Sequence, residues 1–251
     1  MCTHLLLRKI LIFCGVITAL LAGCGGHSGS GTQDNLHGIV TFQQTTAAAA
    51  TECARVFADS TRFLVSDTAP ATPDSTLPPN VAVCTVRNNF VLGSDAVAAP
   101  ATTGGVTLAY ALDDGPVLAS TIPGTSGPLA GPGQAKLQRY ALLALLNATP
   151  GQESEFENFI KLEHIPDVLR NPGFISAQRY RLLYPLTSGV SLYPSTAGVV
   201  VPANMILYEF DSYDLAASVA EVVRRLMTGE TRSSSSMGPG GHVYFLASPA
   251  N

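Results

Sequence analysis

The chain has 251 residues, of which 46% are hydrophobic and 13% are charged. Lys and Arg together number 14 against 18 Asp and Glu, so the net charge is -4. An acidic chain without a basic patch does not suit nucleic-acid binding. The length is enough for one large domain or two small ones.

The first 23 residues have the pattern of an export signal. Arg8 and Lys9 precede an apolar run, residues 10–21, that is too short to span a bilayer comfortably. The run ends in the tetrad LAGC, residues 21–24, which resembles the lipobox of bacterial lipoproteins. The resemblance implies lipidation of Cys24 and a membrane lipoprotein of the bacterial cell envelope, in the outer membrane or on the periplasmic face. An ordinary secretory signal with a chance cysteine is the alternative.

Residues 24–36 are rich in Gly and Ser, and we interpret them as a flexible tether. Two cysteines, Cys53 and Cys84, remain after the signal and Cys24 are set aside. In an exported protein such a pair favours a disulfide, and two separately buried thiols are the alternative.

Residues 37–121 predict a small β-rich, sandwich-like domain, and only the Ala-rich stretch 47–58 suits a helix. No catalytic set is evident in this region. The predicted strands are short and are separated by clusters of Pro, Gly, Ser and Asp, such as the DDG at 113–115. They cover residues 38–43, 62–66, 81–87, 106–112 and 117–121.

Residues 122–135 are rich in Gly and Pro and are predicted to link this region to a second domain, residues 136–249. In the second domain, Pro166 is expected to break or kink the first helix, and the serine-rich loop 229–241 is expected to be mobile. The order β-α-β-β-α-β predicts an α+β, ferredoxin-like fold with one four-stranded antiparallel sheet and both helices on one face. The elements in order are strand 137–147, helix 151–164, strand 174–184, strand 204–211, helix 215–226 and strand 242–248.

The segment EFENFIKLEHIPDVLRNPGFISAQRY, residues 155–180, together with MILYEFDSYD and HVYFLAS, is similar to the dimeric α/β-barrel superfamily. Its EthD-like and small cyclase or monooxygenase-like members look most similar, and the resemblance covers about residues 136–249. It implies a homodimer in which two sheets pack face to face, and many members hold a small apolar or aromatic ligand. The superfamily includes enzymes and proteins of unknown role, so the fold does not fix the function.

His164 and Asp167 are the candidate catalytic residues. The ring of His164 has a pKa near neutrality and suits general acid or base chemistry, and Asp167 is placed to orient it. The alternatives are that His164 caps the end of a helix and that Asp167 stabilises a turn.

Tyr140, Gln178, Tyr180 and Tyr208 are the candidate ligand-binding residues. Tyrosines on the predicted strands can line an aromatic pocket and donate hydrogen bonds, although core packing is the alternative. The sequence shows no metal-ligand spacing, no haem or flavin signature and no phosphate loop, so we expect no metal and no cofactor.

Three functions remain open. The domain binds a small apolar or aromatic molecule, or it is a cofactor-independent cyclase, isomerase or monooxygenase that uses His164, or it is a structural dimerisation module. A pocket around His164 favours the first two, and a filled barrel favours the third. The open face of the sheet predicts a homodimer, unless residues 36–130 fold back over it.

Overall fold

The computed structural model describes residues 36–43, 62–65, 80–87, 106–133, 135–182, 202–239 and 241–247. These residues belong to one compact unit. Cys84 lies in a strand, but Cys24, Cys53 and the predicted helix 47–58 are outside the described ranges, so the lipidation and the disulfide stay predictions. Within these ranges no helix is long and apolar enough to cross a membrane.

Most of the described elements lie where the sequence predicts them, but the predicted strands 106–112 and 117–121 form one strand and the first helix extends beyond residue 164. The strands are β1 (Leu36–Gln43), β2 (Arg62–Val65), β3 (Asn80–Arg87), β4 (Val106–Leu118), β5 (Gln138–Leu146), β6 (Phe174–Leu182), β7 (Asn204–Ser212) and β8 (His242–Ala247). The helices are η1 (Ala119–Thr121), α3 (Glu153–Phe159), η2 (Ile160–His164), α4 (Ile165–Leu169) and α5 (Leu215–Thr228).

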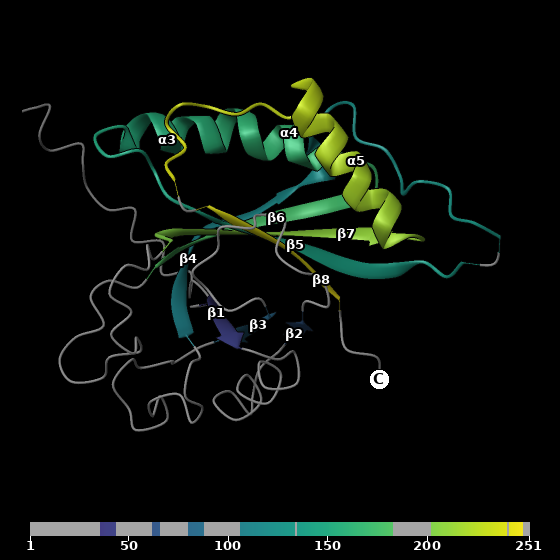
Figure 1. The fold of residues 1–251 in the computed structure, drawn as a ribbon, viewed down its shortest axis with the longest axis horizontal. Helices are drawn as coiled ribbons and strands as arrows, with labels where there is room; N and C mark the ends of the chain where they lie inside the picture. The colour runs from purple at the N-terminus through teal and green to yellow at the C-terminus, as the bar shows by residue number, and fades with distance from the viewer. Residues whose placement is uncertain are drawn as a thin grey trace, which may run out of the picture. The chain divides into compact units, whose positions relative to one another are not determined.

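The second half of the chain has the predicted β-α-β-β-α-β order. Its strands pair antiparallel in the order β8-β5-β7-β6, and the three helices α3, α4 and α5 lie on one face of this sheet (Figure 1). β5 is apolar throughout its second part because both of its faces are covered. Leu143 and Leu145 belong to the core on one face of the sheet, and Leu142 and Leu146 belong to the core under the helices.

The first half does not form a separate sandwich, which corrects the predicted domain boundary at residues 122–135. Its strands pair in the order β4-β1-β3-β2, and β4 pairs with β6 while β2 pairs with β8, so all eight strands close into one barrel. When the strands of each half are numbered one to four, both halves have the ferredoxin-like order 4-1-3-2.

β4 continues through the DDG that the sequence analysis interpreted as a turn. Register shifts on either side of Asp114 accommodate the irregularity. Asp113 and Asp114 form ion pairs with Arg179 on the neighbouring strand β6, and Asp113 also pairs with Arg181. These pairs explain why two adjacent acids occur inside a strand.

Apolar side chains from both halves fill the barrel interior. Tyr110 is fully buried there, and its hydroxyl donates to the carbonyl of Pro202 at 3.0 Å. The sheet face that a second copy was expected to cover is therefore covered by strands of the same chain, as the alternative allowed. The buried members of this core are Val81, Val83, Leu108, Tyr110, Ala141, Leu143, Leu145, Tyr180, Met205, Leu207, Tyr244 and Leu246.

Pro166 does not break the first helix, which corrects one of the two outcomes expected at this residue. The helix continues to Leu169 because its middle, Ile160–His164, widens into one π-helical stretch. A proline inside an α-helix removes one backbone hydrogen bond and clashes with the carbonyl four residues earlier. A π segment directly before Pro166 relieves that clash. His164 consequently lies in the middle of a continuous helix and not at its end.

Candidate functional site

The residue range 230–239, which we call the strap, crosses the helices on its way from α5 to β8. The predicted catalytic pair His164 and Asp167 lies against this strap. Asp167 is 2% exposed, and His164 is 9% exposed. Both residues contact Arg232 of the strap, so the structure brings the two together through a third residue that sequence reasoning did not single out.

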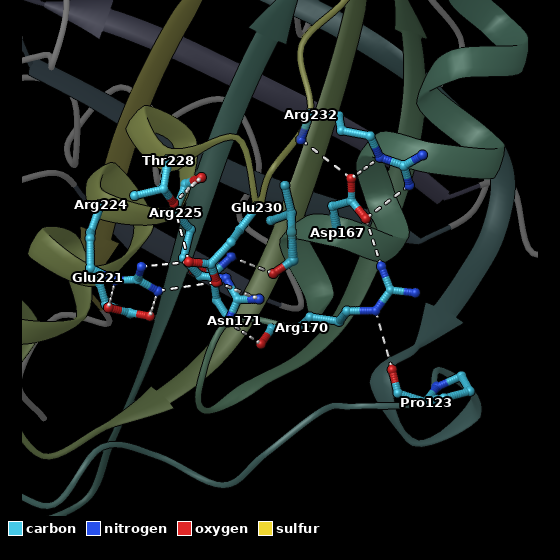
Figure 2. Close-up of polar contacts among 11 residues, drawn as sticks. Pro123, Asp167, Arg170, Asn171, Glu221, Arg224, Arg225, Thr228, Glu230 and Arg232 are labelled. Atoms are coloured by element: carbon cyan, nitrogen blue, oxygen red, sulfur yellow. Dashed lines mark hydrogen bonds and ion pairs between the residues drawn. The ribbon is translucent and has the colours of Figure 1, made fainter.

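Asp167 is held between two arginines (Figure 2). Its Oδ2 accepts from Nε of Arg232 at 2.6 Å, and its Oδ1 accepts from Nη1 of Arg170 at 2.6 Å. The amide of Arg232 also donates to Oδ2 at 3.3 Å. Burial alone raises the pKa of Asp167, but the hydrogen bonds and charge of Arg232 and the charge of Arg170 outweigh it, so this pKa lies below its ordinary value. Asp167 therefore stays ionised.

His164 is buried, with its Nδ1 2.9 Å from the carbonyl of Arg232. Because a carbonyl accepts, Nδ1 carries the proton in this contact. Burial lowers the pKa of His164, and the bond to Arg232 and the charge of Asp167 oppose that shift without cancelling it. The ring is neutral near pH 7 and packs at 5.6 Å from the ring of Phe159. Because this ring donates to a carbonyl of the strap, His164 anchors the strap to the helix.

The four predicted ligand-binding residues do not converge on one cavity. Tyr180 belongs to the barrel core and donates to Oε1 of Gln178 at 2.7 Å. Tyr140 and Tyr208 belong to the core under the helices, on the other face of the sheet. The Tyr208 hydroxyl is buried without a hydrogen-bond partner among the described residues, and burial raises its pKa. The positions of the three tyrosines fit the alternative interpretation, which is core packing.

A pocket of about 460 Å³ lies at the other end of helix α3. It opens where β5 and β6 end and β7 begins, and neither His164 nor Asp167 lines it. Its volume is within the usual range for small-molecule sites. The lining residues are Asn147, Ala148, Glu153, Ser154, Phe156, Glu157, Arg181, Leu182, Ala203 and Asn204.

The rim of this pocket is charged. Glu157 pairs with Arg181 at 2.8 Å, and its other oxygen is 2.8 Å from the buried Arg179. Glu153 accepts from the amide of Gly151 at 3.0 Å, and hydrogen bonds from its own amide and that of Gly151 lower its pKa. Two glutamates and one arginine give the lining a formal net charge of -1.

Two asparagines at the strand ends also line the pocket, and sequence reasoning missed both. Oδ1 of Asn147 accepts from the amide of Ala203 at 2.8 Å, while its Nδ2 is buried without a partner among the described residues. Asn204, which is 8% exposed, faces Leu146 across the sheet. One signal in the sequence could have found them. Asn147 directly follows the apolar strand β5, and Asn204 begins the apolar strand β7.

The described ranges contain no group of three or more His, Cys, Asp or Glu that could hold a metal ion. No protein-family model matches the sequence, and no curated protein matches it.

Several solved structures are similar to this chain over most of its length. An anthrone oxidase-like protein is 12% identical, with 87% of this chain and 93% of that chain covered and a TM-score of 0.46. A variant chlorite dismutase from Candidatus Nitrospira defluvii is also 12% identical, with coverages of 87% and 93% and a TM-score of 0.41. A monooxygenase-like protein from Listeria innocua is 8% identical, with coverages of 87% and 96% and a TM-score of 0.38. At these values the similarities carry no conclusion about activity.

Proposed function

We propose that this chain is a lipid-anchored cell-envelope protein that binds a small molecule in the pocket between helix α3 and the ends of β5 and β6. The observation that carries the proposal is the pocket itself, which has an apolar floor and a charged rim. Phe156, Leu182 and Ala148 supply the floor. Such a combination suits a ligand with an apolar body and one polar group.

The charge of the rim indicates which polar group fits best. Arg181 is engaged by Glu157 and Asp113, so its charge is already balanced. Glu153 forms no ion pair with any residue that the structure describes, and it keeps its charge because its pKa is lowered. A carboxylate on the ligand would be repelled, whereas an amine or a hydroxyl can donate to the rim.

Binding is favoured over catalysis at His164, since the Nδ1 of that ring is engaged by the Arg232 carbonyl and the residue does not line the pocket. The filled barrel interior agrees with a scaffold role for the strands. A homodimer remains a proposal and would need a surface other than the sheet face that β3 and β4 cover.

Three probes with the same ring and different head groups test the pocket: benzylamine, benzyl alcohol and benzoate. Saturation-transfer NMR on the intact chain in lipid nanodiscs should detect the amine and the alcohol but not benzoate. Ser154→Trp places a large side chain at the pocket, because Ser154 is exposed and lines it, and should abolish both signals. Asn158→Trp, on an exposed position of α3 outside the lining, is the matched control and should leave them intact. Equal signals in both tryptophan variants would refute the proposed site.

The lipid anchor has its own test. In the parent, Cys24 should carry radiolabelled palmitate and the protein should fractionate with membranes. Cys24→Ala should lose the label, remain uncleaved by lipoprotein signal peptidase or unlipidated, and fractionate less with membranes. Labelling that persists in Cys24→Ala would contradict the anchor without affecting the pocket.

A further inference from the structure

The start of the strap contacts α5, where Glu230 pairs with Arg224 and the amide of Thr231 donates to the carbonyl of Arg225. Beyond this start the strap is fixed at two further places, although its serine-rich sequence suggested a mobile loop. Ser236 is fully buried, and Thr231 is 5% exposed. One anchor is on the helices at Arg232. The other is on the pocket wall, just after the end of β5.

The anchor on the helices consists of charged contacts. Arg232 binds Asp167 through Nε and Nη2 and binds Glu163 through Nη1 at 2.7 Å. Its carbonyl accepts from His164. Three residues within one helical turn and a half, Glu163, His164 and Asp167, therefore bind a single strap residue. Asp167 is buried, so this pair is screened by solvent less than an exposed ion pair.

The anchor on the pocket wall consists of backbone contacts. The amide of Gly238 donates to the carbonyl of Asn147 at 2.7 Å, and the amide of Thr149 donates to the carbonyl of Ser236 at 2.8 Å. The hydroxyl of Thr149 donates to the carbonyl of Ser235 at 2.8 Å. A Cβ on Gly238 would lie 2.6 Å from the carbonyl oxygen of Ala148, so only glycine allows this approach.

Asn147 and Ala148 are lining residues of the pocket. The strap therefore joins Arg232, which does not line the pocket, to two residues that do. We propose that Arg232 is a positioning residue for the pocket: by binding Asp167 it fixes the strap, and the strap holds Asn147 and Ala148 in place. The inference rests on the proposed function. The effect of Arg232 on the contacts between the strap and the pocket wall, which we call the link, can nevertheless be measured without any ligand.

Hydrogen exchange on the intact chain in mild detergent tests the link. Arg232→Gln should speed exchange of the Thr149 and Gly238 amides by about tenfold or more, because both amides are protected only while the strap is seated. Arg139→Gln is the matched control. Arg139 also pairs with two carboxylates, Glu209 and Asp211, and is about as exposed as Arg232, but both of its partners lie on β7, outside the strap. Unchanged exchange in Arg232→Gln would overturn the inference.

A second pair of variants keeps the test decisive if Arg232→Gln does not fold. Gly238→Ala forces the strap away from Ala148 and should speed exchange at Thr149 while the helical anchor is intact. Gly127→Ala, at a position with open space around it, is its control. Arg232→Lys keeps one charge contact and should give an intermediate rate.

Benzylamine provides the ligand arm. In the parent its binding should slow exchange at both amides, since coupling between two sites is reciprocal. In Arg232→Gln its dissociation constant should rise several-fold, and in Arg139→Gln it should not change. If benzylamine fails to bind the parent, the proposed function fails, and the exchange rates without ligand still decide the link. Faster exchange with an unchanged dissociation constant would limit Arg232 to a structural role and overturn the inference.

Discussion

Nη2 of Arg179 lies 2.8 Å from the carboxylate of Glu157, which joins strand β6 to helix α3. The arginine side chain is only 5% exposed, and it also pairs with Asp113 and Asp114 of β4. One buried cation thus connects three elements from both halves of the chain.

Removing that cation should destabilise the fold. Arg179→Gln leaves three carboxylates without their shared partner, and we expect the free energy of unfolding to fall by about 3 kcal/mol. Glu157→Gln should cost only about 1 kcal/mol, because Arg179 keeps its other two acids. Urea unfolding measures both values, and Arg224→Gln at the exposed end of α5 should show no change. A smaller loss for Arg179→Gln than for Glu157→Gln would contradict this assignment.

The buried His164 predicts how stability depends on pH. Burial lowers its folded-state pKa below the ordinary value of 6.5, so the unfolded chain takes up a proton at a higher pH than the folded one. The stabilisation is complete above pH 6.5 and is lost as the pH falls from there towards the folded pKa.

His164→Gln should flatten the dependence in that window by up to about 1.4 kcal/mol per pH unit. Urea unfolding at pH 7.5, 6.5 and 5.5 provides the comparison. His242, whose pKa burial also lowers, accounts for part of the remaining slope, so the double variant should be flatter still. An unchanged slope in His164→Gln would show that the ring does not titrate abnormally.

The closed barrel predicts that the second half alone will self-associate. A fragment of residues 136–251 lacks β1–β4 and exposes the apolar face that carries Leu143, Leu207 and Leu246. Light scattering should report a dimer or larger species for this fragment. Adding a separate fragment of residues 35–135 should convert it to a one-to-one complex. A monomeric fragment 136–251 with native-like stability would contradict the barrel.

Gly173 is the glycine whose replacement should matter most in the turn before β6. Its φ is +83°, and a Cβ there would lie 2.2 Å from the carbonyl oxygen of Asp211. Gly173→Ala should lower the free energy of unfolding by about 2 kcal/mol or more. Thermal melts should show a clear drop for this variant and almost none for Gly127→Ala, which has no such contact.

Local patterns in the sequence were sufficient for most of the elements. Alternation and turn residues predicted the positions of the described strands to within a few residues, and the apolar spacing predicted α5. Alternation says nothing about which strand a given edge will pair with, because that depends on residues far apart in the chain. The pairing of β4 with β6, and hence the barrel, was for that reason missed.

The errors near the candidate site have a common cause. DDG resembles a turn until Arg179 and Arg181 are placed beside it, and a serine-rich stretch looks mobile until Asp167 binds Arg232. Pro166 disfavours an ordinary helix, but a local π segment accommodates it. In each case a contact or backbone adjustment that composition does not encode decides the outcome. The pocket was missed because its residues come from four separate segments, none of which has a chemical motif.

The two halves share one strand order, so the β4–β6 joint of the barrel corresponds to the β8–β2 joint. In a symmetric pair of identical subunits, every substitution occurs twice and must suit both positions. In a single chain each substitution occurs once, so a change that shapes the pocket beside β5–β7 need not be tolerated on the opposite side. All residues that line this pocket lie in the second half, so we expect saturation at one ligand per polypeptide.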